Sequence, residues 1–211
     1  MCYYTEQKET LKKVATRFRA TADNPDNFLQ SDYIVGFEYR NLPIIKNTSP
    51  EIITTNHTWG LIPQGREIDF RKNTLNARIE TIGQKPSFHA SINNRCLVIA
   101  TAYFDWHWDD PKGKSKTKYR INSSEDEIFA FAGLFSSWTD RTGNDINTFT
   151  IVTTQANEQM RYIHNRKADE NDQRMPVMLR RGDESNWLDQ SNPVADFAYP
   201  NYKQHLIGFP V

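Results

Sequence analysis

The sequence predicts an α+β fold: one domain over residues 2–211, built on a curled, barrel-like and mostly antiparallel β-sheet with flanking helices. Short runs rich in β-branched and aromatic residues recur along the chain, whereas helical periodicity is confined to a few places. Polar loops between those runs favour hairpins. A chain of 211 residues with 37% hydrophobic residues can form one large core, and no repeat or low-complexity linker divides it.

The first half of the chain combines helices with extended segments. Apolar residues at helical spacing predict a helix over 6–20, with Lys and Arg on its other face. Pro86 followed by serine is typical of a helix start and predicts a short helix over 87–93. The remaining β-like runs predict extended segments over 33–38, 43–46, 51–55 and 59–63, the last ending at a proline.

The second half has the clearest β signals. A continuous apolar run at 96–100 extends through aromatic residues to Trp106. Polar loops over 109–117 and 139–146 indicate that the flanking strands pair as a meander. Strands are also predicted over 118–121, 128–134, 148–154 and 175–179, and helices over 155–164 and 184–188.

The formal charge is balanced, with 26 basic and 26 acidic residues. A neutral chain has no long-range attraction to nucleic acid, so any phosphate contact depends on local groups. Each basic group has a second interpretation as an ordinary solvated surface. The candidate groups are Arg71–Lys72, the run Lys112–Lys118, and Arg161, Arg166, Lys167, Arg174, Arg180 and Arg181.

Cys2 and Cys96 are the chain's two cysteines, and their spacing does not fit a zinc site. The polar start does not resemble a signal peptide, and no apolar run approaches the length of a membrane span. We therefore expect free thiols in the reducing cytoplasm. We also expect no metal, no cofactor, no membrane partner and a monomer.

Cys2 is the first candidate for chemistry. Removal of Met1 would place an α-amine and a thiol on one residue, with ordinary pKa values of about 7.7 and 8.5. The amine can attack an aldehyde to form a Schiff base, and the thiol can then close a five-membered thiazolidine. The alternative is a small buried hydrophobic residue or an idle thiol.

Asn76 and Arg78 have side chains suited to a sugar and a phosphate, although Arg78 also fits a surface ion pair. Asp105 lies between two aromatic residues, and such a partly desolvated carboxylate suits proton transfer; the alternative is a turn residue. His164 suits general acid/base work, although a lone histidine is often structural. Trp59, Trp106 and Trp108 are candidates to stack on bases, whereas Trp138 and Trp187 fit a core.

A series of motifs follows Cys2 in a fixed order. The segments are 59–63 (WGLIP), 75–81 (LNARIET), 85–88 (KPSF), 95–98 (RCLV), 104–106 (FDW), 131–134 (FAGL), 149–154 (FTIVTT), 163–166 (IHNR) and 174–177 (RMPV). This series resembles the SRAP (SOS response-associated peptidase) family, also described as abasic-site processing proteins. The resemblance extends from residue 2 to about residue 190.

The resemblance implies a protein that binds single-stranded DNA and links its N-terminal cysteine to the ring-opened sugar of an abasic site. It also implies self-removal of residues that precede the cysteine, hence the peptidase name. Cys2 matches the nucleophile. Asn76 and Arg78 match positions that hold the sugar and adjacent phosphate, and His164 matches the acid/base for ring opening and crosslink reversal. Asp105 matches a glutamate beside the α-amine, and DNA contacts are implied for Thr153, Arg166 and Trp106.

The chain departs from the family pattern at four places. Tyr3–Tyr4 replace a common Gly-Arg, and Gln64–Gly65 stand where many members have tryptophan. Asp105 is one methylene shorter than the usual glutamate, and a proton donor misplaced by about 1 Å can cost about 10²-fold in rate. The stretch Lys167–Gln173 separates the histidine motif from RMPV.

Two other functions remain open at the level of sequence. The first is a cysteine hydrolase that pairs Cys2 with His164 and uses Asp105 as the orienting carboxylate, although no oxyanion-hole loop is evident. The second is a non-covalent DNA-binding module that has lost the chemistry at Asp105.

Overall fold

The computed structural model describes residues 2–166 and 173–211, so most of the separating stretch Lys167–Gln173 lies outside the described residues. The helices are α1 (Leu11–Phe18), α2 (Pro86–His89), α3 (Glu158–Ile163) and α4 (Glu184–Leu188). The strands are β1 (Tyr4–Gln7), β2 (Thr21–Ala22), β3 (Ser31–Val35), β4 (Asn41–Lys46), β5 (Ser49–Trp59), β6 (Asn76–Arg78), β7 (Arg95–Ala100), β8 (Ala102–Trp108), β9 (Lys116–Ser123), β10 (Phe129–Thr139), β11 (Asp145–Gln155), β12 (Arg174–Pro176), β13 (Met178–Leu179) and β14 (Leu206–Pro210).

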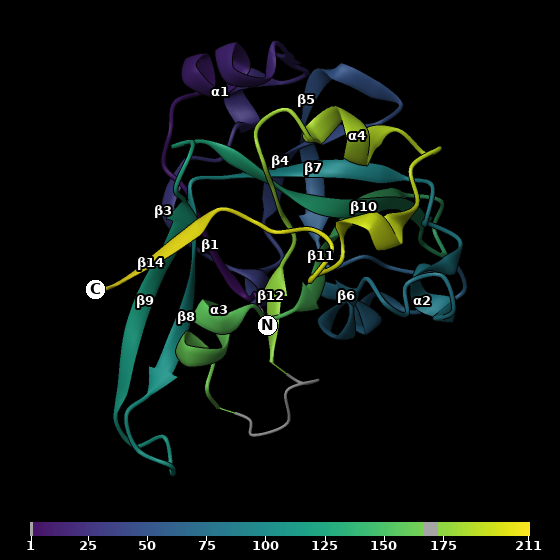
Figure 1. The fold of residues 1–211 in the computed structure, drawn as a ribbon. Coiled ribbons are helices and arrows are strands. Elements are labelled where there is room, and N and C mark those ends of the chain that lie inside the picture. Colours follow the sequence, from purple (N-terminus) through teal and green to yellow (C-terminus); the bar gives the residue numbers. More distant parts are fainter. Residues whose placement is uncertain (1, 167–172) are drawn as a thin grey trace.

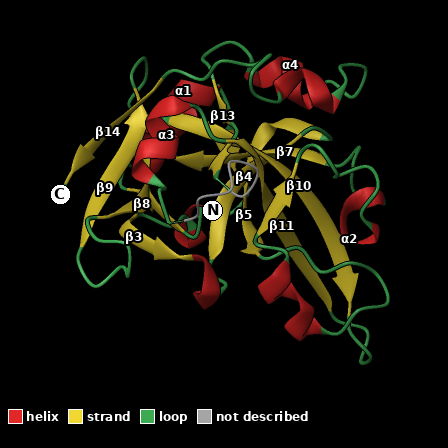
Figure 2. Ribbon diagram, turned by 60° about the horizontal axis from the view of Figure 1, so that its bottom comes forward, coloured by secondary structure: helices red, strands yellow, loops and turns green. Residues whose placement is uncertain are grey.

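Five strands form a closed barrel in the order β11-β10-β7-β4-β5. Four of the five pairings are antiparallel. A short parallel contact between β11 and β5 closes the ring, with Thr148 opposite Thr58 and Phe149 opposite Trp59. The predicted fold class, α+β on a barrel-like and mostly antiparallel sheet, is therefore confirmed (Figures 1 and 2).

Trp59 lies at the point where the barrel closes. Its ring is fully buried, and its Nε1 donates to the Leu75 carbonyl at 2.8 Å. The strand ends here, because Gly60 adopts a positive φ of 115° that a side chain would strain. The predicted extension of the strand to residue 63 is therefore wrong, and so is the prediction that Trp59 stacks on DNA. Trp138 and Trp187 are buried, as predicted.

A second sheet packs beside the barrel in the order β14-β9-β8-β1-β3. Its strands β8 and β9 form a hairpin that projects from the body of the molecule, at the lower left of Figure 1. α3 packs against β8 and also contacts β12. β12 pairs with β11 and so belongs to the barrel sheet. The N-terminal strand and the hairpin are thus brought next to the barrel.

Several predicted helix bounds shift because capping residues decide them. The helix predicted over 6–20 begins at Leu11, because the Thr10 hydroxyl caps the Lys13 N–H, and residues 4–7 form a strand instead. The helix predicted over 155–164 begins at Glu158, where Asn157 caps the Met160 N–H. The predicted helix over 87–93 spans only Pro86–His89, and the strand predicted over 33–38 ends at Val35.

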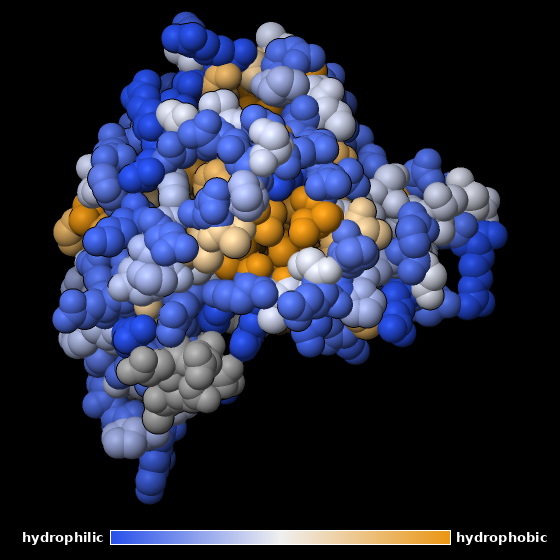
Figure 3. Space-filling view, turned by 45° about the vertical axis from the view of Figure 1, so that its right-hand side comes forward, coloured by the Kyte–Doolittle hydropathy of each residue, from blue (hydrophilic) through white to orange (hydrophobic). Residues whose placement is uncertain are grey.

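The surface is mostly hydrophilic on the side shown in Figure 3, with a hydrophobic area in the hollow at its centre. None of the helices in the described part of the chain is long and apolar enough to cross a membrane.

Candidate active site

Four elements bring the predicted site residues together. Cys2 lies two residues before the start of β1, and Asn76 begins β6. Asp105 lies on β8, and His164 ends α3. β6 joins the barrel through a parallel pairing with β11, in which Ile151 lies opposite Asn76. Residues that are up to 162 positions apart in sequence therefore surround the N-terminal cysteine.

Cys2 is buried, with only 1% of its surface exposed. Burial raises the pKa of its thiol far above the ordinary value, and two smaller effects oppose it: the positive charge of the chain's N-terminal amine and the backbone N–H of Tyr4, which hydrogen-bonds the sulfur. The nearby Asp105 carboxylate raises the pKa further. The sulfur is therefore held as a neutral thiol at physiological pH.

Asn76 contacts Cys2 directly. Its Nδ2 donates to the Cys2 carbonyl at 2.8 Å. Its Oδ1 is buried and has no hydrogen-bond partner among the residues that the structure describes. An unsatisfied buried acceptor costs about 1–3 kcal/mol, so this oxygen is poised to accept a hydrogen bond from a bound molecule.

Asp105 and His164 form a close pair. The His164 Nδ1 lies 3.0 and 2.9 Å from the two carboxylate oxygens, and both side chains are largely buried. One oxygen of Asp105 also accepts from the backbone N–H of Trp106 at 2.9 Å. Gln173 Nε2 donates to the backbone carbonyl of His164 at 3.1 Å and so holds the backbone of this residue. The Asp105 carboxylate fixes the orientation of the imidazole.

The predicted DNA contacts differ in accessibility. Arg78 and Arg166 are exposed, and the Arg166 guanidinium lies 5.4 Å from the centre of the Trp108 ring. Trp106 is half-buried and meets the Tyr4 ring edge-on. Thr153 is fully buried, and its hydroxyl donates to the Ala77 carbonyl at 3.3 Å. Thr153 therefore offers no accessible surface, and its DNA contact stays a prediction.

Some predicted basic groups are engaged within the protein. Arg174 makes a forked ion pair with Glu80 at 3.0 and 2.6 Å and is 4% exposed, so it is not available to phosphate. Arg180 pairs with Asp183 at 2.7 Å. For Arg174 the interpretation as a phosphate contact is therefore wrong, whereas the Arg180 side chain is 40% exposed and its phosphate contact stays a prediction.

Tyr103 is a site residue that sequence reasoning missed. It lies two positions before Asp105 on β8, so both side chains point to the same face. Its ring is fully buried, and its hydroxyl donates to the Met160 sulfur at 3.2 Å. Burial, with the neighbouring Cys2 and Asp105, raises its pKa well above the ordinary value. The period of two along the strand was the signal that could have identified it.

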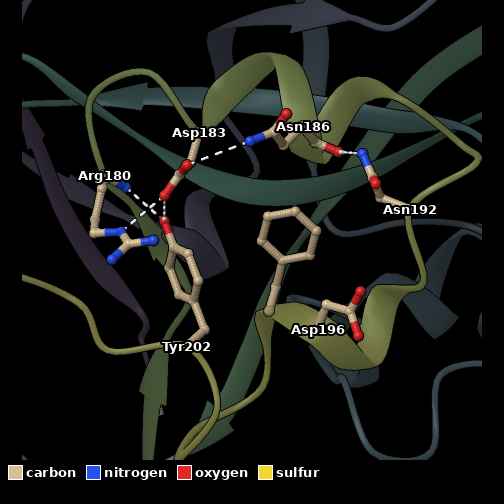
Figure 4. A pocket seen from close by; sticks show the side chains of 7 residues that line it. Arg180, Asp183, Asn186, Asn192, Asp196 and Tyr202 are labelled. Atoms are coloured by element: carbon tan, nitrogen blue, oxygen red, sulfur yellow. Dashed lines mark hydrogen bonds and ion pairs between the residues drawn. The ribbon is translucent and has the colours of Figure 1, made fainter.

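A separate pocket between α4 and the C-terminal segment contains none of these residues (Figure 4). The Asp183 carboxylate accepts from Arg180 Nε and from the Tyr202 hydroxyl, so these groups satisfy one another. Among the described residues, no group of three or more His, Cys, Asp or Glu side chains is arranged to hold a metal ion.

Comparison with known proteins matches this arrangement to one family. The chain matches the SOS response associated peptidase (SRAP) family over residues 1–211 and belongs to it, which confirms the resemblance. A relative in Bacillus subtilis, the abasic site processing protein YoqW, is 38% identical over 141 residues, which are 66% of this chain and 58% of that protein. The chicken abasic site processing protein HMCES is 28% identical over 165 residues, which are 67% of this chain and 46% of that protein.

Two solved structures share the fold. A crystal structure of a protein from Bacteroides thetaiotaomicron superposes with a TM-score of 0.86 at 30% identity, and the match covers 100% of this chain and 92% of that one. A protein from Bordetella bronchiseptica gives 0.77 at 22% identity, over 100% and 99% of the two chains, which shows the fold alone. The matched region spans 58% of the length of the Bacillus relative.

Proposed function

We propose that this protein handles abasic sites in single-stranded DNA and captures them covalently through Cys2. The relatives named for abasic-site processing support the broader role. The single observation that carries the finer proposal is the gathering of Asn76, Asp105 and His164 around the N-terminal cysteine. We place the activity in the response to DNA damage, where a captured lesion is shielded from strand cleavage.

The reaction begins with the abasic deoxyribose, which is mostly a closed hemiacetal. His164 protonates the ring oxygen and so assists opening to the aldehyde. The α-amine of Cys2 attacks the aldehyde carbon, and Asp105 takes or relays the amine proton. Loss of water gives the imine. The thiol then adds to the imine carbon, its proton goes to the nitrogen, and a thiazolidine closes; the reverse steps release the DNA.

The site favours this chemistry over a cysteine hydrolase. A hydrolase requires a thiolate paired with a histidine, whereas burial holds the Cys2 thiol protonated. Among the described residues, the His164 imidazole is hydrogen-bonded to the Asp105 carboxylate. In aldehyde capture the amine acts first, so a neutral thiol suffices. We keep peptidase activity only for removal of residues that precede Cys2.

Contacts with DNA would come from both accessible cations and an unsatisfied acceptor. Asn76 Oδ1, which has no hydrogen-bond partner within residues 2–166 and 173–211, fits a sugar hydroxyl. Arg78 and Arg166 are exposed and fit the flanking phosphates, and Trp106 offers a ring to a neighbouring base. A non-covalent binding module would share these contacts but would have no use for a free amine at Cys2.

The test is a denaturing gel of the Met-processed protein mixed with single-stranded DNA that contains one abasic site. We expect a shifted species that survives denaturation and is absent for Cys2→Ala. Intact mass verifies that Cys2 is the first residue in each sample. An equally abundant species with Cys2→Ala, or none with the natural protein, would refute covalent capture. A second sample with residues added before Cys2 reports, by mass, whether they are removed.

A further inference from the structure

Strand β8 has two chemically distinct faces. Its side chains alternate, so Asp105 points toward His164, while Phe104, Trp106 and Trp108 lie on the opposite face of the sheet. None of these three aromatic residues belongs to the two main clusters of the core. Phe104 is nevertheless buried, with 5% of its surface exposed, whereas Trp106 and Trp108 are half-buried. The opposite face therefore carries two tryptophan rings that remain partly accessible.

Neighbouring strands add two tyrosines to this face. Tyr4 on β1 lies 4.7 Å from the Trp106 ring and stacks on Tyr33 of β3 at 5.5 Å. Tyr33 also lies 5.3 Å from Phe104, and it is 38% exposed. We call the five rings of Tyr4, Tyr33, Phe104, Trp106 and Trp108 the aromatic face.

Two lysines of β9 lie beside these rings. In the hairpin register Lys118 is opposite Trp106, and Lys116 is opposite Trp108. The Lys118 ammonium lies 4.5 Å from the Tyr33 ring and 4.1 Å from the Phe104 ring, and Lys116 lies 5.0 Å from Trp108. Neither lysine is ion-paired with a carboxylate within the described residues. Both charges are therefore available to an anion.

One acid of the neighbouring strand β1 is already ion-paired. Glu6 of β1 accepts from Arg120 at 3.0 and 2.6 Å, and Lys8 lies 3.8 Å from it. The aromatic face therefore has a local positive charge, although the whole chain is neutral.

Arg166 joins the aromatic face to the candidate active site. Its guanidinium lies 5.4 Å from the Trp108 ring, and its charge also acts on Tyr3, the residue after Cys2. Asn165 holds this segment against β8, because it accepts from the Trp108 N–H and donates to the Trp108 carbonyl, at 2.8 and 2.9 Å. A strand that leaves the cysteine would meet Arg166 first and the aromatic face next.

We propose that the aromatic face is a second binding surface for single-stranded nucleic acid, with bases on the accessible rings of Tyr33, Trp106 and Trp108 and phosphates on Lys116 and Lys118. Partly exposed rings beside lysines that form no ion pair within the described residues suit a strand whose bases are unstacked. An acidic peptide would use the two lysines but would leave the rings without partners. This surface extends the DNA contacts of the proposed function, with which it shares Trp106, and it needs neither Cys2 nor an abasic site.

The test measures binding of an intact, fluorescein-labelled oligodeoxythymidylate by fluorescence anisotropy at several salt concentrations, with every protein in the Cys2→Ala background. The key variant is Lys116→Gln/Lys118→Gln. The matched control, Lys12→Gln/Lys203→Gln, removes the same charge from α1 and from the segment before β14. Loss of two phosphate contacts should lower the slope of log K against log salt by about 1.4.

A second variant tests stacking. Trp108→Ala should raise the Kd roughly 5- to 150-fold, since one base stack is worth about 1–3 kcal/mol. The Trp108 ring packs so closely against Gly113 that a side chain at position 113 would not fit. Since loss of this ring could disturb the hairpin, circular dichroism should verify that the variant is folded. If Trp108→Ala is misfolded, the binding data for Lys116→Gln/Lys118→Gln test the proposal by themselves.

The proposal is overturned if the key variant keeps the slope and affinity of the control, or if the parent fails to bind the intact strand. It is also overturned if poly-glutamate competes as well as the oligonucleotide, which would assign the face to acidic peptides. None of these outcomes alters the crosslinking test, because covalent capture is measured separately with Cys2 present.

Discussion

Replacing Asp105 with Asn should slow covalent capture, and most of the loss should act through His164. The carboxylate contacts the imidazole Nδ1 at 2.9 and 3.0 Å in a site where the two side chains are 11% and 15% exposed. A hydrogen bond to a charged group contributes about 1.5–3 kcal/mol. At about 1.4 kcal/mol per tenfold change, the rate should fall roughly 10- to 150-fold.

The assay is a time course of crosslinking to abasic single-stranded DNA, with intact mass to verify a free amine on Cys2. A double-mutant cycle with His164→Ala separates the two roles of the carboxylate. If Asp105 works by orienting the imidazole, Asp105→Asn should have little further effect once His164 is removed. Fully additive losses, or a wild-type rate for Asp105→Asn, would refute this reasoning.

Asp105→Glu serves as the charge-preserving control. It keeps an anionic acceptor but adds a methylene to a largely buried site, so it should retain more activity than Asp105→Asn and less than the natural protein. A variant faster than the natural protein would show that reach toward the α-amine limits the rate, as the glutamate of many family members implies.

Two further predictions concern stability. Burial, with a smaller effect of Lys46, lowers the pKa of His57 to about 4, so the unfolded chain binds the proton first as the pH falls below about 6.5. The stability that neutral His57 contributes is complete above pH 6.5 and is lost as the pH falls toward 4. The free energy of unfolding, measured by urea titration, should therefore fall by roughly 3 kcal/mol over this range. If His57→Gln lost the same free energy of unfolding over the same pH range, His57 would not be the cause. Gly133→Ala would place a Cβ 2.8 Å from Cys96 Sγ and from Val98 Cγ2, and should cost about 1–3 kcal/mol, seen as a lower Tm; an unchanged Tm would show that the barrel wall can adjust.

Local signals accounted for much of the fold. β-branched and aromatic runs predicted most of the strands, and the polar loop over 109–117 matches the turn of the β8–β9 hairpin. Helix bounds were less accurate, because periodicity over 6–20 could not show that Thr10 caps a helix beginning at Leu11. The ends depend on single hydrogen bonds, whereas the element type depends on many side chains.

The candidate site was predicted as a set of residues but not as a geometry. The motif order named Cys2, Asn76, Asp105 and His164 through the family resemblance. Nothing local could indicate that His164 lies against Asp105, since 59 positions separate them in sequence. Tyr103 was missed because its role depends on what the strand faces.

By itself the sequence determined the fold class, the family and the chemical types present, because these follow from neighbouring residues and from motif order. Only the tertiary structure decided which face each residue occupies. Closure of the barrel through Thr58 and Thr148 buries Trp59, a residue whose ring could otherwise have stacked on DNA. Packing of the N-terminal segment into the core likewise takes the Cys2 thiol out of water and so holds its pKa high. Burial and long-range contact are properties of the closed sheet, and no local stretch of sequence contains them.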